Sequence, residues 1–240
     1  MAVTTSHRER PGIFITLEGG EGAGKTTQAQ LLRRRLEQSG HKVVVTREPG
    51  GTHLSEEIRR IILRPSAELR PNPPASGTSS DPDVASRSSL LPEAEVLLFL
   101  AARAQLVAEV IRPTLERGGI VICDRYSDST LAYQGYGRGL DIEAVAAADK
   151  LATGGLRPDL SVLLELPVEV GLARKTANAE WDSIGQESRE FHERVHAGFR
   201  QLVAREPGRW LVVDATLPAE VIGERIWERV APLVRPLAVG

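Results

Sequence analysis

The chain has 240 residues, of which 41% are hydrophobic and 26% charged, a composition typical of a globular protein that can bury a substantial core. The formal net charge of -2 argues against nucleic acid as the main partner, because proteins that bind duplexes usually carry a basic surface. The single cysteine, Cys123, excludes an internal disulfide and a cysteine cluster for zinc, and no apolar run is long enough to cross a bilayer.

Residues 1–11 are polar and end at Pro11-Gly12, where the first apolar run begins. Because they lack the apolar core of a signal peptide, we expect a mobile N-terminal arm and a cytoplasmic protein. From residue 12 to about 235, apolar runs alternate with amphipathic stretches. This alternation predicts a single domain of the α/β class with a parallel sheet covered by helices.

The apolar run 13–17 predicts a buried strand, and a stretch that favours a helix from residue 26 to 39 follows it closely. Between them lies the pattern G-x-x-x-x-G-K-[ST], made of Gly19, Gly20, Glu21, Gly22, Ala23, Gly24, Lys25 and Thr26, with Thr27 directly after it. Glycines in such a loop let backbone N–H groups turn toward phosphate oxygens, and the helix dipole adds positive potential. Lys25 is placed to reach the β- and γ-phosphates, and the Thr26 hydroxyl to bind Mg²⁺. The loop therefore predicts binding of a nucleoside triphosphate.

The second strand is expected at 42–46, with a short helix at 55–63. Arg47 follows this strand directly, and ligands of open α/β sheets bind at the carboxyl ends of strands. Arg47 is thus placed to meet an anion, although an ordinary surface arginine is the alternative.

Residues 65–90 are rich in proline, serine and glycine and contain almost no large apolar side chains. Such a stretch cannot bury enough surface to offset the entropy of ordering it. We therefore interpret it as a disordered surface insertion rather than a domain boundary.

A long helix is expected from residue 91 to 117, with Phe99 and Arg103 on one face because they lie four positions apart. Spacing alone favours core packing for Phe99. The strand 119–124 ends in Asp124, which suits a carboxylate that holds Mg²⁺ directly or through water, and Arg125 beside it would face the cleft. Further strands are expected at 160–166 and 211–214, with a closing helix from 218, which makes five strands in all.

These segments together resemble the bacterial thymidylate kinase family, a branch of the P-loop nucleoside monophosphate kinases. The resemblance is collinear from about residue 12 to 235 and is interrupted mainly by the insertion. It rests on the P-loop, on Arg47-Glu48-Pro49-Gly50-Gly51, on Phe99 with Arg103, on Asp124-Arg125-Tyr126 with Tyr133-Gln134-Gly135, and on Arg157-Pro158-Asp159. A P-loop alone is generic, but these segments in this order are specific.

The resemblance implies transfer of a phosphoryl group from ATP to dTMP with Mg²⁺ held by Thr26 and Asp124, and it implies a homodimer. It assigns the dTMP site to Glu21, Arg47, Phe99, Arg103, Arg125, Ser129, Thr130, Tyr133 and Gln134. In this assignment Phe99 stacks on the thymine, Arg103 meets the base edge, and Arg47 and Arg125 hold the acceptor phosphate. Glu21 accepts a hydrogen bond from the sugar 3′-hydroxyl, and Tyr133 disfavours a ribose.

The chain departs from this family in its catalytic arginines. One branch of the family has an arginine at the position of Gly22, and the other supplies arginines from a lid that corresponds here to residues 175–188. Thr176, Asn178 and Ser183 stand at positions where that branch has arginines. The catalytic residues expected from the motifs are Lys25, Arg125, Arg174 and Lys175.

Three hypotheses would account for the missing arginines. Arg174, Lys175 or Arg189 supplies the missing charge, or a slow kinase relies on Lys25 and Mg²⁺, or the protein is a regulatory nucleotide binder that scarcely catalyses. A kinase for another acceptor, such as dUMP or thymidine, is a further alternative. The pair Arg47 and Arg125 favours an acceptor that already carries a phosphate.

Overall fold

The structure is a computed structural model that describes residues 12–64, 90–177 and 183–234. The expected N-terminal arm, nearly all of the insertion (residues 65–89) and part of the expected lid (residues 178–182) lie outside the described residues. Among the helices of the described ranges, none combines the length and the apolar character that crossing a bilayer requires.

Five parallel strands form one sheet in the order β2-β3-β1-β4-β5, so the expected fold class is confirmed. The strands are β1 (Ile13–Glu18), β2 (Val43–Arg47), β3 (Ile120–Asp124), β4 (Leu160–Glu165) and β5 (Trp210–Asp214). The three central strands are mostly apolar and are buried at nearly every position, because both faces of the sheet are covered.

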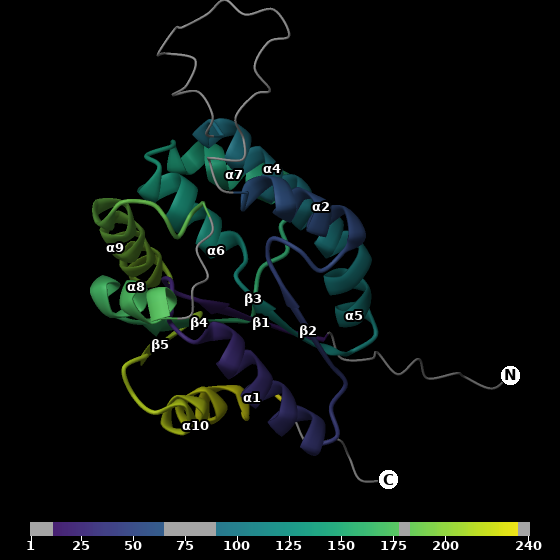
Figure 1. Cartoon of the computed structure of the whole chain (residues 1–240). Helices are drawn as coiled ribbons and strands as arrows, with labels where there is room; N and C mark the ends of the chain where they lie inside the picture. The colour runs from purple at the N-terminus through teal and green to yellow at the C-terminus, as the bar shows by residue number, and fades with distance from the viewer. Residues whose placement is uncertain (1–11, 65–89, 178–182, 235–240) are drawn as a thin grey trace, which may run out of the picture.

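Helices cover both faces of the sheet (Figure 1). On one face lie α1 (Lys25–Gln38) and α10 (Ala219–Val230), and on the other lie α4 (Pro92–Leu106) and α9 (Arg189–Arg205). The remaining elements are α2 (His53–Ile62), η2 (Val107–Ile111), α5 (Arg112–Glu116), α6 (Ser127–Thr130), η3 (Leu131–Gly137), α7 (Ile142–Thr153) and α8 (Val168–Ala177).

The side chains of β1 alternate between two cores, as the period of a strand requires. Ile15 and Leu17 pack in the cluster that includes the buried faces of α1 and α10. Phe14 points the other way and packs with Leu106 and Ile111 of the α4–η2 segment. The sheet is therefore held from both sides, and its carboxyl edge stays free to carry loops.

The expected helix at 91–117 is one continuous helical segment that changes its hydrogen-bonding pattern at η2. Pro113 lies in the first turn of α5, directly after η2, and a proline has no N–H to donate to the preceding turn. The π-helical turn adjusts the backbone to this lost bond. A second π-helical segment, η3, occupies residues 131–137.

The strand register brings the candidate site residues to one edge. Asp124 is the register partner of Leu17 in β1 and of Arg47 in β2. The P-loop, the segment after Arg47 and the segment after Asp124 consequently leave the sheet side by side, as open α/β sheets do at their ligand sites.

A buried carboxyl group lies directly beneath this edge. Glu18 has no exposed surface and accepts hydrogen bonds from the Tyr126 backbone N–H at 3.0 Å and from the Ser129 hydroxyl at 2.6 Å. Burial and the nearby negative charge of Asp128 raise the pKa of Glu18 to about 8. The proton that this carboxyl holds in the folded state is therefore linked to stability.

We expect Glu18→Gln to change how stability depends on pH. The folded protein binds the Glu18 proton more tightly than the unfolded chain does, so this contribution is complete below pH 4.5 and is lost as the pH rises toward about 8. In urea unfolding between pH 5 and 9, the stability of the wild type relative to the variant should fall by up to about 1.4 kcal/mol per pH unit and then level off. Parallel curves for the two proteins would contradict the assignment.

Candidate active site

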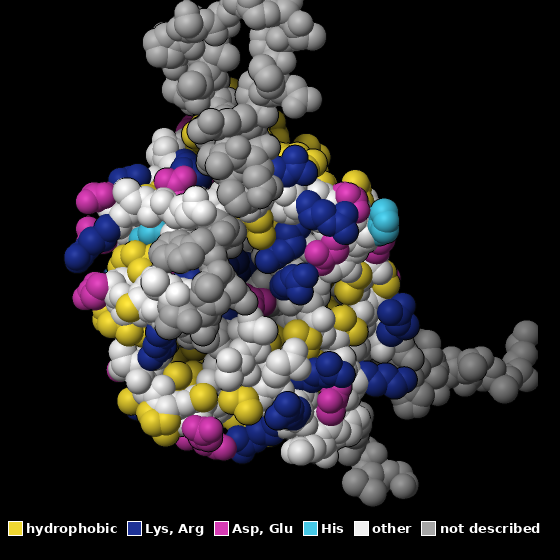
Figure 2. All heavy atoms as spheres, in the orientation of Figure 1, with side chains coloured by type: hydrophobic (Ala, Val, Ile, Leu, Met, Phe, Trp, Pro, Cys, Tyr) yellow, Lys and Arg dark blue, Asp and Glu magenta, His cyan; other side chains and the backbone are white. Residues whose placement is uncertain are grey.

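A cleft of about 730 Å³ opens at the carboxyl edge of β1, β2 and β3. Its lining joins the two halves of the expected site, and Lys and Arg side chains gather on this face of the molecule (Figure 2). The P-loop contributes Glu21, Gly22, Ala23, Gly24, Lys25, Thr26 and Thr27, and the other elements contribute Arg47, Phe99, Arg103, Asp124, Arg125, Ser129, Thr130, Tyr133, Gln134, Arg174 and Lys175. Gly19 and Gly20 lie just behind this wall, where their carbonyl groups contact Lys25.

The P-loop has the geometry of an anion cradle. Gly24 is the N-cap of α1 in a left-handed conformation with φ of 84°, which a residue without a Cβ adopts at little cost. Lys25 lies in the first turn of α1, and its Nζ donates to the carbonyl oxygens of Gly20 at 2.8 Å and Gly19 at 3.3 Å. Burial and the charge of Arg125 lower the pKa of Lys25 to about 8. The ammonium group is thus held at the loop, where a bound anion would favour its protonated, charged form.

Close packing against α8 explains the glycine at position 22. A Cβ at Gly22 would lie 2.3 Å from the carbonyl oxygen of Gly171, and a Cβ at Gly171 would lie 2.3 Å from the carbonyl oxygen of Glu21. Gly22 also has a φ of 65°, which disfavours any larger residue. The loop and α8 touch through bare backbone, so no arginine fits at position 22 in this arrangement.

Thr26 and Asp124 form the part of the cleft that suits a magnesium ion. The Thr26 hydroxyl donates to the Asp124 carboxylate at 2.8 Å, which places two hard oxygen ligands at the helix start and the strand end. Magnesium in phosphoryl-transfer sites takes one or two protein oxygens and completes its shell with phosphate and water. The described residues contain no cluster of three or more metal-binding side chains, and that kind of shell needs none.

Glu21 is the centre of the cleft's hydrogen bonding. Its carboxylate accepts from Arg125 at 2.8 Å, from the Lys175 ammonium at 2.8 Å and from the Tyr133 hydroxyl at 3.1 Å. Burial alone would raise the pKa of Glu21, but the charges of Arg125, Lys25 and Lys175 lower it well below its usual value. Glu21 is therefore ionised and orients three donors around the P-loop.

Arg125 has the backbone conformation that these contacts require. Among the described residues other than glycine, it is the one with a positive φ, at 71°. Its guanidinium donates to the Gly19 carbonyl at 2.9 Å and lies 4.8 Å from the centre of the Tyr133 ring. Strained backbone of this kind persists where the surroundings hold it, and it is common at functional sites.

Arg103 is fixed from several sides at the wall of the cleft. Only 1% of it is exposed, and its Nε donates to Glu48 at 2.7 Å, its Nη1 to Asp149 at 2.6 Å and its Nη2 to the Thr130 hydroxyl at 2.8 Å. Paired carboxylates of this kind lock the orientation of a buried guanidinium. Phe99, one helical turn earlier, is partly buried and lines the same wall, so it belongs both to the core and to the cleft.

The other expected acceptor residues are also held by hydrogen bonds to neighbouring side chains. Arg47 is exposed and donates to Glu56 at 3.2 Å, so it is both a surface arginine and a cleft residue. Gln134 donates its amide N–H to Glu95 at 2.8 Å, and Ser129 lies 3.4 Å from Arg125.

The three cations proposed to replace the lid arginines lie in different surroundings. Lys175 is 9% exposed and contacts Glu21 inside the cleft. Arg174 also lines the cleft but donates to the backbone carbonyl of Ala215 at 3.1 Å. Arg189 lies outside it, exposed, and pairs with Glu193 at 2.7 Å. Of the three, Lys175 is the cation that reaches the P-loop.

Several residues that shape the cleft were not found from the sequence. Glu48 lies in a recognised motif, but its role as partner of Arg103 depends on packing between segments far apart in the chain. Nothing in the local sequence points to Asp149 as a partner of Arg103, because it resembles any polar residue on the surface of a helix. Gly171 offered one signal, since a glycine inside a helix is unfavourable unless close packing requires it.

Comparisons with known proteins agree with this geometry. The family model for thymidylate kinase matches residues 17–73 and 83–226. A thymidylate kinase of Thermomicrobium roseum is 50% identical over 223 residues, which cover 92% of this chain and 96% of that protein. A thymidylate kinase of Deinococcus radiodurans is 46% identical over 220 residues, with coverages of 92% and 97%.

A solved structure has the same fold. The crystal structure of thymidylate kinase from Ehrlichia chaffeensis superposes with a TM-score of 0.66 and 30% sequence identity, covering 92% of this chain and 99% of that one. The sheet order, the P-loop cleft and the length of these matches lead to one conclusion. The chain belongs to the thymidylate kinase family.

Proposed function

We propose that this protein transfers the γ-phosphoryl group of ATP to the phosphate of dTMP, giving ADP and dTDP for dTTP synthesis. The observation that carries this proposal is the joining of a P-loop cradle and an aromatic, arginine-lined wall in one cleft. The first half suits a nucleoside triphosphate, and the second suits a nucleoside monophosphate. Both substrates occur in the cytoplasm, where we place the reaction.

The donor half binds and orients the triphosphate. The backbone N–H groups of the loop and the N-terminus of α1 would receive the β- and γ-phosphates, with Lys25 turning from the loop carbonyls toward the anion. Thr26 and Asp124 would hold Mg²⁺, which neutralises charge on the phosphates when it is bound.

The acceptor half selects a thymine nucleotide that already carries phosphate. Phe99 offers a flat apolar face for the base, and Arg103 presents a guanidinium fixed by its carboxylate partners. Arg47 and Arg125 supply the charge for the acceptor phosphate, with the two-pronged geometry that phosphate favours.

The ring of Tyr133, held against Arg125, would exclude a ribose 2′-hydroxyl, and Glu21 would receive the 3′-hydroxyl of the sugar. The remaining polar wall of this half is formed by Ser129, Thr130 and Gln134.

Catalysis in this reaction is mainly positioning and charge neutralisation, because the acceptor phosphate is already an anionic nucleophile. Arginines that reach the phosphoryl transition state are worth roughly 10³–10⁵ in rate in related enzymes. In this chain we assign that role to Lys175, supported by its burial beside Glu21 and the P-loop. Arg174, at the rim of the same cleft, is the second candidate.

We propose that the enzyme is a homodimer that pairs through α2, α4 and α7. These helices pack together and expose large apolar side chains, namely Leu54, Ile61, Leu97 and Leu151. Monomeric proteins rarely expose apolar residues in such a group. A second copy of the same surface would cover them.

The proline- and serine-rich stretch at 65–90 is proposed to be an insertion in the family's chain, with the lid at about 175–188. The family match leaves out residues 74–82, which supports the position of the insertion.

The experiment that tests the proposed function measures ADP release from Mg-ATP with dTMP, dUMP, dCMP, AMP and thymidine as acceptors. We expect turnover with dTMP at least tenfold above that with any other acceptor, because the cleft offers sites for both the base and the phosphate. Turnover with thymidine instead would assign the cleft to a nucleoside. Binding of ATP and dTMP without turnover would assign the protein to a regulatory role.

A further inference from the structure

The turn at residues 183–188, which leads into α9, is attached to the acceptor half of the cleft. Ile184 lines the cleft and is 7% exposed, while the Ser183 hydroxyl donates to the Ile62 carbonyl in α2 at 2.8 Å. At the other end of the turn, Glu187 accepts from the Arg138 Nη1 at 2.5 Å. The turn therefore has anchors on both sides of the residue that enters the cleft.

Arg138 follows η3 directly and contacts a second carboxylate. Its Nη2 and Nε donate to the two oxygens of Glu95 at 2.8 and 3.2 Å. The ring of Phe191 lies 4.8 Å from the guanidinium, which fixes its plane further. One arginine thus bridges α4, through Glu95, and the turn, through Glu187.

Glu95 connects this bridge to the nucleotide pocket. It is 5% exposed, and the oxygen that accepts from Arg138 also accepts from the Gln134 amide at 2.8 Å. Gln134 lines the acceptor wall, and Phe99 lies one helical turn after Glu95 on α4. A change at Gln134 or Phe99 on nucleotide binding would therefore reach Glu95 and Arg138 directly.

We propose that Arg138 is a positioning residue that couples occupancy of the acceptor pocket to the turn at 183–188. The inference rests on the proposed function and adds a mechanism of coupling to it. With the base against Gln134, the Glu95 carboxylate is held in place and keeps the Arg138 guanidinium oriented toward Glu187. The turn then holds Ile184 in the cleft, which keeps water away from the reacting phosphates.

The test compares steady-state kinetics of Arg138→Gln and Glu187→Gln with the wild type. Because Arg138→Gln frees both carboxylates, we expect a KM for dTMP raised about tenfold and a kcat lowered about tenfold, with the KM for ATP changed less than about twofold. Glu187→Gln removes the charge of the link to the turn and leaves Glu95 untouched, so kcat should fall while the KM for dTMP stays within about twofold. Arg138→Lys keeps the positive charge but not the planar guanidinium that reaches both carboxylates, so it should recover part of the loss in kcat and in KM for dTMP.

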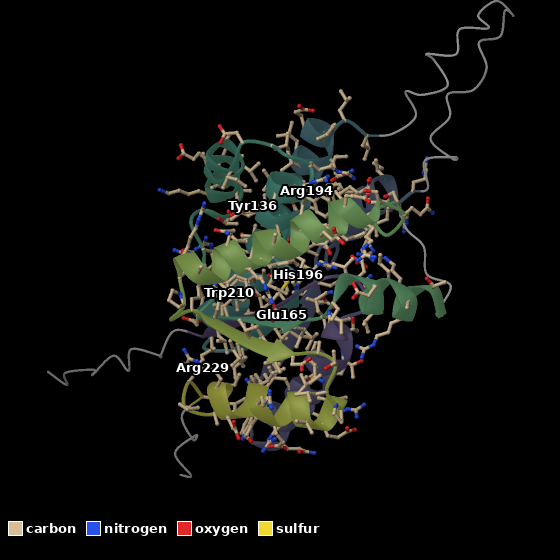
Figure 3. The ribbon with its side chains drawn as sticks, turned by 90° about the vertical axis from the view of Figure 1, so that its left-hand side faces the viewer. Tyr136, Glu165, Arg194, His196, Trp210 and Arg229 are labelled. Atoms are coloured by element: carbon tan, nitrogen blue, oxygen red, sulfur yellow. The ribbon has the colours of Figure 1, made fainter. Side chains whose placement is uncertain are left out.

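Arg194→Gln is the matched control. Arg194 lies on α9 beside the same segment (Figure 3), donates to the Gly137 carbonyl at 2.8 and 3.0 Å and lies 6.0 Å from the Phe191 ring. Its hydrogen bonds go to this backbone carbonyl rather than to Glu95 or Glu187, so it shares the packing of Arg138 without its bridge. We expect the KM values and kcat of Arg194→Gln within about twofold of the wild type. If Arg138 acted only through packing on Phe191, which Arg194 shares, Arg138→Gln and Arg194→Gln would have the same kinetic profile.

A second readout does not depend on turnover. Hydrogen exchange of residues 183–191 should slow on addition of dTMP to the wild type, and this protection should be lost in Arg138→Gln at saturating dTMP. Equal protection in the two proteins would overturn the coupling while leaving the proposed function intact. Failure of the wild type to bind or turn over dTMP would instead overturn the proposed function, and this inference with it.

Discussion

The Glu21 carboxylate is the contact on which the rest of the cleft depends, because it holds the donor half, the acceptor half and α8 together. Arg125 and Tyr133 reach it from the acceptor side, and Lys175 reaches it from α8. These charges keep the carboxyl ionised despite its burial. A single anion inside the P-loop thereby orients three groups that line the cleft, before any substrate arrives.

The contact between Glu21 and Lys175 depends in turn on two glycines, one in the P-loop and one in α8, whose backbones touch. Gly22 and Gly171 let α8 approach the P-loop so closely that a Cβ on either residue would clash with a carbonyl oxygen. A chain that packs α8 this way has no room for an arginine in the loop, and the approach brings Lys175 to the same place. The glycine at position 22 and the placement of Lys175 beside Glu21 are therefore two consequences of one packing arrangement.

Local patterns predicted the parts of the fold and of the site that depend on neighbours in sequence. The five strands, the P-loop and the positions of Asp124 and Arg125 at a strand end all follow from short apolar runs and their flanking residues. The partners of Arg103 could not be predicted, since Glu48 and Asp149 come from segments 55 and 46 positions away and meet only through packing. The different surroundings of Arg174, Lys175 and Arg189 likewise could not be predicted, since they depend on the orientations of α8 and α9.

The most direct test of this account is the single-turnover rate of phosphoryl transfer in Lys175→Met, with Lys175→Arg and Arg189→Gln as comparisons. If Lys175 supplies the charge at the transferring group, the rate in Lys175→Met falls by about 10²–10³ at saturating substrates. Lys175→Arg should retain most of the rate, and Arg189→Gln, altered at an exposed site outside the cleft, should match the wild type. A Lys175→Met rate within about threefold of the wild type would contradict the account.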